Sequence, residues 1–154
     1  MDFSQLLSPE GIKVLGAVSS KKRLLQEVGD LAASAYAMDA NLVVEALIAR
    51  EALGPTGVGH GVALPHARMS GLTDVVGLFL LLEKPVDFGA VDRQPVDIAF
   101  ALFAPEDAGV EHLKALALVS RTLRDTSVCA KLRANPDATK LFAILSEAQS
   151  KKAA

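Results

Sequence analysis

The sequence predicts an α/β sandwich, in which helices cover a central group of strands. Three observations lead to this fold class. Segments with apolar residues at helical spacing occupy both ends of the chain. Between them, residues 75–82 and 96–103 form continuous apolar runs that are typical of strands buried on both faces. A glycine-rich stretch over residues 54–61 precedes these strands and predicts a loop.

Five segments have the apolar spacing of a helix with one buried side. We expect helices over about 21–36, 40–53, 111–124, 126–133 and 138–148. Ser19 or Ser20, Asp39 and Asp125 precede three of them as side chains that can cap a helix. The residues expected to face the core are Leu24, Leu25, Val28, Leu31, Ala32, Ala35, Val43, Ala46, Leu47, Leu53, Leu113, Leu116, Ala117 and Leu123.

The remaining segments predict short strands and connections. The amino-terminal arm has a turn at residues 8–11 and a short strand at 13–15. Residues 62–64 suggest another short strand, which presents His66 at its end. With 154 residues, of which 51% are hydrophobic, the chain suits a single domain over residues 1–154 with a loose tail over 149–154.

Composition excludes several classes of function. The formal net charge is −2, from 16 basic and 18 acidic residues, so no basic surface for nucleic acid is indicated. No apolar run approaches the roughly 20 residues of a spanning helix, and the first residues do not resemble a signal peptide. The single cysteine, Cys129, excludes an internal disulfide and is expected in the core. We therefore expect a cytoplasmic protein without membrane insertion.

His66 is the first candidate for chemistry. It follows the predicted strand after the glycine-rich loop, where a side chain can be both held and reachable. A neutral imidazole offers a ring nitrogen that can attack phosphorus, and phosphoryl transfer needs mainly positioning and charge stabilisation. Loop amides and the Thr56 hydroxyl can supply donors to phosphoryl oxygens. A histidine near such a loop is also compatible with a purely structural role.

Arg50 and His112 are further candidates, each with a structural alternative. Arg50 lies on the apolar side of its helix, where it can pair with Asp97 or Glu51 or clamp a phosphate. His112 lies in the first turn of its helix, where it can pack against a neighbouring carbonyl or act as a second imidazole beside His66.

Metal and nucleotide binding are disfavoured. A zinc site would need His60, His66 and His112, but their spacing is not a usual ligand spacing and no fourth ligand is evident. The glycine-rich loop lacks the Lys-Ser/Thr pair of a P-loop. We therefore expect neither a metal nor another cofactor.

Residues 56–67, TGVGHGVALPHA, strongly resemble the signature of the fructose/mannitol-type enzyme IIA domains of the bacterial phosphotransferase system. Residues 47–51, 94–102 and 111–117 resemble further segments of that family in the same order. The resemblance implies a three-layer α/β/α sandwich with a mixed sheet of about five strands. His60 departs from the pattern, since many relatives are expected to have asparagine there.

The resemblance also implies roles for particular residues. The histidine that closes the motif is the family's phosphoryl acceptor, which gives His66 that role, through its Nε2. Arg50 and His112 match the family's active-site arginine and second histidine. The loop residues expected to bind the phosphoryl group are Thr56, Gly57, Gly59, His60 and Gly61.

Within that family the chain is most similar to the nitrogen-regulatory branch, because of residues 6–10 and 19–23. This implies a phosphotransferase-system component that receives its phosphoryl group from an HPr-type phosphocarrier. Its phosphorylation state would then regulate target proteins such as transporters or sensor kinases. The alternative is a transport component that hands the group to a fructose or mannitol permease. A metal-dependent hydrolase built on the three histidines is a weaker rival.

Overall fold

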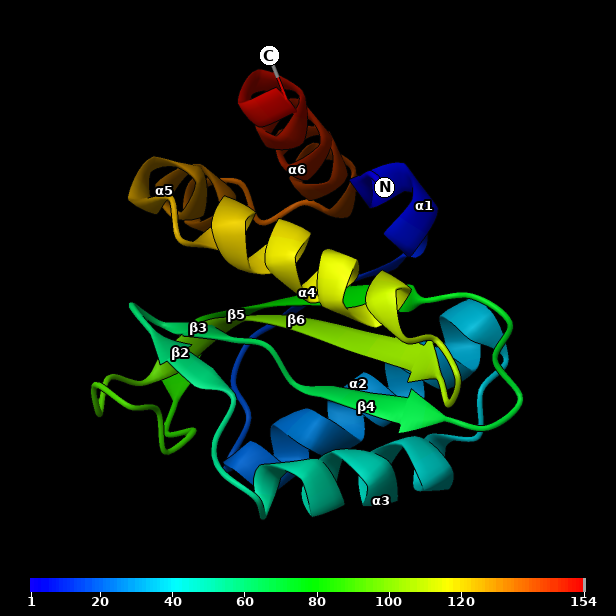
Figure 1. The fold of residues 1–154 in the computed structure, drawn as a ribbon. Coiled ribbons are helices and arrows are strands. Elements are labelled where there is room, and N and C mark those ends of the chain that lie inside the picture. The colour runs from blue at the N-terminus through cyan, green and yellow to red at the C-terminus, as the bar shows by residue number, and fades with distance from the viewer. Residues whose placement is uncertain (154) are drawn as a thin grey trace.

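A computed structural model describes the backbone of residues 1–153 and the side chains of residues 1–148. It contains a mixed sheet of six strands with helices on both faces (Figure 1). The strands are β1 (Leu7–Leu15), β2 (Gly57–Gly59), β3 (Val62–Ala63), β4 (His66–Met69), β5 (Val76–Val86) and β6 (Val96–Pro105). The helices are α1 (Phe3–Leu6), α2 (Lys21–Tyr36), α3 (Ala40–Glu51), α4 (Val110–Leu123), α5 (Thr126–Ala134) and α6 (Ala138–Ala153). The predicted α/β/α sandwich is confirmed, with six strands rather than about five.

The sheet is organised around β5 and β6, which pair antiparallel at its centre. β1 runs parallel to β5 on one side. On the other side of β6, two short parallel strands follow one another: β3 beside its start and β4 beside its end. β2 pairs antiparallel with β3 and completes the edge. The break between β3 and β4 therefore lies directly before His66, which begins the short edge strand β4.

Alternating side chains of the central strands fill two separate cores. On one face Phe79 and Phe100 pack with α1, α4, α5 and α6. On the other face Leu80 and Phe103 pack with α2 and α3. Because both faces are covered, the central parts of the two strands are apolar and buried, as the apolar runs predicted.

The predicted helices are present with small differences in length. α2 matches its expected range, and its cap Ser20 accepts a hydrogen bond from the Arg23 amide. α3 ends at Glu51, two residues early, so that Leu53 is 85% exposed instead of buried. α6 continues to Ala153, past the expected end at residue 148, and Ala154 of the predicted loose tail lies outside the described residues.

The buried side of α4 differs from the prediction. Leu113 is 65% exposed and Ala117 is also exposed, whereas His112 and Ala115 face the core. Leu123 is buried as predicted, and Leu116 is partly buried. At Leu113 and Ala117 the apolar residues fit two neighbouring stripes at helical spacing, and the sequence pattern alone selected the wrong one. His112 is therefore on the buried side of α4.

The amino-terminal arm is a full edge strand rather than a turn with a short strand. β1 begins at Leu7, and its register with β5 shifts between Leu7 and Ile12. The irregularity accommodates Pro9, which an edge strand tolerates. Tyr36 fastens this irregular stretch, since its hydroxyl accepts a bond from the Ser8 amide and donates to the Gly77 carbonyl.

Of the helices that the structure describes, none combines the length and apolarity needed to cross a membrane.

Candidate active site

His66 is the first residue of β4 and lies beside Leu102 of β6. Its backbone is fixed by the preceding residue, because the Pro65 carbonyl accepts a hydrogen bond from the Leu102 amide at 3.0 Å. Pro65 itself is buried and has no amide hydrogen to satisfy. The ring of His66 remains half-buried at the edge of the sheet. The position is therefore rigid in its backbone and accessible in its side chain.

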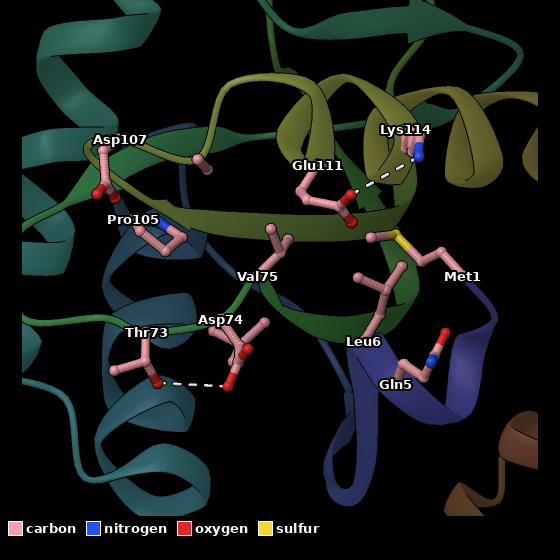
Figure 2. Close-up of a pocket in the computed structure, with 12 residues that line it drawn as sticks. Met1, Gln5, Leu6, Thr73, Asp74, Val75, Pro105, Asp107, Glu111 and Lys114 are labelled. Carbon is pink, nitrogen blue, oxygen red and sulfur yellow. Dashed lines mark hydrogen bonds and ion pairs between the residues drawn. The ribbon is translucent and has the colours of Figure 1, made fainter.

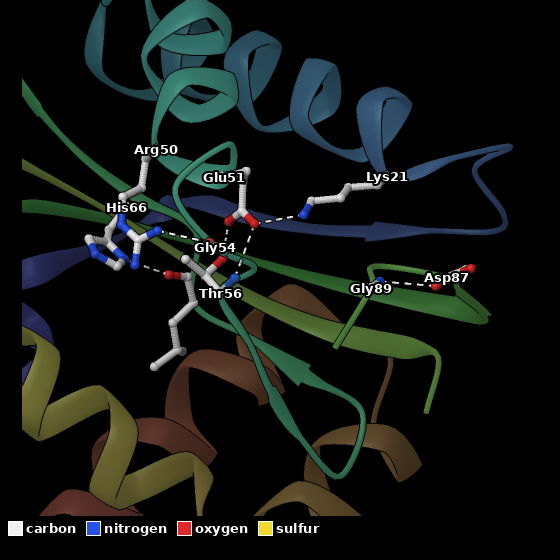
Figure 3. Close-up of polar contacts among 9 residues, drawn as sticks. Lys21, Arg50, Glu51, Gly54, Thr56, His66, Asp87 and Gly89 are labelled. Atoms are coloured by element: carbon white, nitrogen blue, oxygen red, sulfur yellow. Dashed lines mark hydrogen bonds and ion pairs between the residues drawn. The ribbon is translucent and has the colours of Figure 1, made fainter. Parts of the chain in front are cut away.

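One hydrogen bond assigns the two ring nitrogens of His66 different roles. Nδ1 lies 2.8 Å from the Leu64 carbonyl oxygen, which can only accept, so Nδ1 carries the hydrogen (Figure 3). In the neutral ring Nε2 then has a free lone pair. The nitrogen with nucleophilic character is thus the one turned away from the backbone.

His112 lies next to His66, with ring centroids 5.6 Å apart and the rings tilted by 68°. It is 6% exposed, and its Nε2 has no hydrogen-bond partner among the described residues. Burial, followed by the positive charges of His66 and Arg68, lowers the pKa of His112 below 6.5. The ring is therefore neutral at physiological pH, with a buried polar atom that lacks a partner.

His112 also lies in the first turn of α4, a helix of 14 residues. The helix begins at Gly109, whose φ of 56° suits glycine, and no side chain caps it. An uncapped helix start carries partial positive charge. Both His112 and this helix end favour an anion next to His66.

Arg50 reaches the same place from the opposite face of the sheet. It is in the last turn of α3, which packs against β4, and its side chain extends toward His66 (Figure 3). Nη1 donates to the Gly54 carbonyl at 2.9 Å. Neither carboxylate considered as its partner is available: Asp97 binds Arg133 and Glu51 binds Lys21. Within the described part of the chain, Arg50 has no ion pair, so its charge is free to meet an anion.

Thr56 does not offer its hydroxyl to this site. The hydroxyl donates to Glu51 Oε1, and the Thr56 amide donates to Glu51 Oε2 at 3.0 Å. Both groups expected to bind a phosphoryl oxygen are thus occupied by a carboxylate.

The glycine-rich stretch also folds away from His66. Gly57, Gly59 and Gly61 belong to the β2–β3 hairpin, which extends toward the start of β6. The Asp97 amide donates to the Gly61 carbonyl. Asp97 is five residues before Leu102, the residue of β6 that lies beside His66. At about 3.3 Å per residue this separation is roughly 17 Å. Gly61 is therefore far from His66 and lies against Arg133 of α5, while Gly59 lies against Asp92 and Gly57 against Ala90. Binding of the phosphoryl group by these glycines remains a prediction.

His60 lies at the turn of this hairpin and not with the other two histidines. It is exposed, its amide donates to Asp92 Oδ2, and its carbonyl accepts from Arg133. Gly61 has φ of +79°, and an added Cβ would come within 2.6 Å of Arg133. The structure thus does not bring three histidines together as the zinc hypothesis requires.

A cavity of about 850 Å³ lies beside the start of α4 (Figure 2). Its lining includes Thr73, Asp74, Pro105, Asp107 and Glu111 but none of the three candidate residues. The histidine pair is thus reached at the sheet edge and not from inside this cavity. An edge position is suited to a donor carried on another macromolecule.

Two contributors could not be identified from the sequence. The Leu64 carbonyl sets the ring orientation of His66. This contact could be predicted only if the break between β3 and β4 were known. Arg68 follows His66 by two residues on β4, so both side chains are on the same face, and its Nη1 donates to the Glu106 carbonyl before α4. Alternation along a strand would have indicated Arg68 once β4 was predicted.

A mixed α/β/α domain that presents one imidazole beside a second imidazole and an unpaired guanidinium has the features of a histidine phosphoryl-transfer protein. The comparison with family models agrees: residues 5–148 match the family described as phosphoenolpyruvate-dependent sugar phosphotransferase system, EIIA 2. The chain belongs to this family, and it is a phosphoryl-transfer component of that system.

Several relatives with similar sequences are nitrogen regulatory proteins. The one from Bradyrhizobium diazoefficiens is 46% identical over 145 residues, covering 94% of this chain and 95% of the relative. The one from Escherichia coli K12 is 37% identical over 150 residues, covering 97% and 92%. The crystal structure of nitrogen regulatory protein IIA-Ntr from Neisseria meningitidis has a TM-score of 0.86 at 37% identity, covering 93% of this chain and 98% of that one.

Proposed function

We propose that the chain is a phosphohistidine carrier that accepts a phosphoryl group at His66 and regulates other proteins through its phosphorylation state. The observation that carries the proposal is a combination found among the described residues: a His66 Nε2 without a partner, an Arg50 without an ion pair and a His112 Nε2 without a hydrogen bond. Each of the three lacks a partner that one phosphoryl group would supply.

The transfer needs a single displacement at phosphorus. The donor is an HPr-type phosphocarrier with a phosphorylated imidazole. The lone pair of His66 Nε2 forms a bond to phosphorus as the bond between phosphorus and the donor nitrogen breaks, and the donor imidazole leaves with that electron pair. The Leu64 carbonyl supports the positive charge that develops on the His66 ring through Nδ1–H. Arg50 and His112 donate to the phosphoryl oxygens, and the α4 start adds its dipole. No metal or nucleotide takes part.

Phosphorylation gives the protein two states that differ strongly in charge. A phosphoryl group adds about −1.5 to −2 at neutral pH, on a chain whose formal net charge is −2. The change falls on a half-buried side chain at the edge of the sheet, where a partner can sense it. Such a switch suits control of target proteins such as transporters or sensor kinases in the cytoplasm.

The regulatory role is supported by the nitrogen regulatory relatives at 37–46% identity. Sugar transport is the second candidate, because a fructose-specific EIIA component from Haloferax volcanii is 30% identical over 132 residues. A solved complex of mannitol IIA with phosphorylated mannitol IIB illustrates that kind of transfer for its own proteins. An assay for passage of the phosphoryl group to a sugar-specific IIB domain separates the two roles: a regulator does not pass it on efficiently.

The acceptor is tested by incubating the protein with a phosphorylated HPr-type carrier and measuring its intact mass. We expect the wild type and His60→Ala to gain one phosphoryl group, and His66→Ala to gain none. His60→Ala is the matched control because it removes an imidazole from the same edge of β6. Stable phosphorylation of His66→Ala would overturn the proposal.

A further inference from the structure

We propose that Glu51 is a positioning residue for phosphoryl transfer, which holds the Gly54–Thr56 turn so that the Arg50 guanidinium faces His66. Glu51 does not touch the reacting atoms. It follows Arg50 directly at the end of α3, on a side of the helix that faces the turn instead of the histidine. The inference rests on the proposed function.

The Glu51 side chain is buried, and both of its carboxylate oxygens accept hydrogen bonds. Its side chain is 6% exposed. Oε2 accepts from Lys21 Nζ at 2.7 Å and from the Thr56 amide at 3.0 Å, and Oε1 accepts from the Thr56 hydroxyl (Figure 3). A buried carboxylate is costly without such partners, so these groups are held together as a unit.

This unit fixes the turn that orients Arg50. Arg50 is anchored by a hydrogen bond from its Nη1 to the Gly54 carbonyl at 2.9 Å. Gly54 has φ of +149°, which other residues rarely adopt. Because glycine is free to adopt many backbone conformations, Gly54 does not itself make this turn rigid. Glu51 supplies the rigidity, because its two bonds to Thr56 close the turn on its far side.

The same unit connects to the backbone before His66. The Thr56 carbonyl accepts from the Leu64 amide at 3.0 Å, and the Leu64 carbonyl accepts from His66 Nδ1. The turn that anchors the Arg50 guanidinium is thus bonded to the segment that orients the His66 ring. Loss of the Glu51 contacts would let Arg50 move relative to His66, and misplacement by about 1 Å can lower a rate as much as 100-fold.

Lys21 joins this unit from the start of α2. Besides binding Glu51, its ammonium lies 4.4 Å from the ring centroid of the buried Phe88. A lysine in the first turn of a helix opposes the helix dipole. The contacts with Glu51 and Phe88 give a reason for its presence there.

The experiment is a double-mutant cycle on the maximal rate of phosphoryl transfer from a phosphorylated HPr-type carrier. Glu51→Gln is introduced into the wild type and into Arg50→Ala, with Thr56→Val as a second variant that removes one bond to the carboxylate at similar volume. Glu27→Gln is the matched control. Its carboxylate also binds two cations, Lys13 and Arg23, but is remote from the turn.

We expect Glu51→Gln to lower the maximal rate by roughly tenfold or more in the wild type, with little change in the half-saturating donor concentration. In Arg50→Ala the same substitution should lower it by less than threefold, because the group it positions is absent. Thr56→Val should give the same pattern, and Glu27→Gln should leave the rate unchanged. Equal reductions in both backgrounds, or no reduction in the wild type, would overturn the inference. Phosphorylation of His66→Ala in the same assay would instead overturn the proposed function.

Discussion

Two regions beside β6 each combine a histidine with an arginine, but the bonding of the two arginines differs. At its end, His66 lies near Arg50, and neither Nε2 of the ring nor the guanidinium has an acidic partner among the described residues. At its start, His60 lies near Arg133, but Asp97 binds this guanidinium through Nε and Nη2 at 2.9–3.0 Å. The His60 carbonyl accepts a further bond from it.

The two arginines differ in whether the guanidinium already binds a carboxylate, and this difference indicates which of them can bind a phosphoryl group. A guanidinium that already binds a carboxylate in bidentate geometry has little left for a phosphoryl group. Arg133 therefore joins α5, β6 and the β2–β3 hairpin, and Arg50 remains available for an anion. Unused hydrogen-bonding and charge capacity, not residue type or proximity to histidine, distinguishes Arg50 from Arg133.

The largest expected contrast comes from exchanging the two arginines for alanine. Arg50→Ala should lower the rate of phosphoryl transfer by about 10²–10³, the usual effect of removing one group that stabilises transition-state charge. Arg133→Ala should leave the rate close to that of the wild type. Its expected effect is a loss of about 1–3 kcal/mol in the free energy of unfolding, because Asp97 loses its partner. Stopped-flow transfer assays and urea unfolding of both variants provide the measurement.

The comparison fails if the two profiles are reversed. A folded Arg50→Ala protein with normal transfer, or an Arg133→Ala protein of normal stability and impaired transfer, would show that bonding in the unphosphorylated structure does not distinguish the two roles.

A smaller effect is expected in the pH dependence of stability. Because the pKa of His112 is lowered in the folded state, the unfolded chain binds more protons once the pH approaches 6.5. The free energy of unfolding should therefore decrease as the pH falls through this value toward the folded-state pKa. His112→Gln should show a shallower decrease than the wild type between about pH 7.5 and about pH 5.5. Urea unfolding at several pH values measures the slope.

His60→Gln serves as the control for this slope, since its ring is exposed and should leave the decrease unchanged. An identical slope in the wild type and in His112→Gln would contradict the idea that the second imidazole is held neutral beside His66.

Local pattern was sufficient for much of the fold. The limits of α2 follow from its apolar spacing and its Ser20 cap, and the central parts of β5 and β6 follow from their long apolar runs. Helix spacing was not sufficient for α4, where two stripes fit equally and only packing against the sheet selects the one with His112. Burial of Cys129 was predicted correctly.

The three candidate side chains of the proposed site could be named from the sequence, but their surroundings could not. The roles of His66, Arg50 and His112 came from a resemblance, and the structure places the three at one sheet edge. The direction of the glycine hairpin depends on Asp97 and on Arg133, which follow Gly61 by many residues, so no local pattern contains it. For the same reason the capture of Thr56 by Glu51 was not foreseen.

The central claim is that His66 uses Nε2, because the Leu64 carbonyl occupies Nδ1–H. Long-range ¹H–¹⁵N NMR spectra of the phosphorylated protein identify which ring nitrogen carries phosphorus. The account predicts one phosphorylated histidine, His66, with phosphorus on Nε2 and the hydrogen retained on Nδ1. Phosphorus on Nδ1 of His66, or on either of the other two histidines, would contradict it.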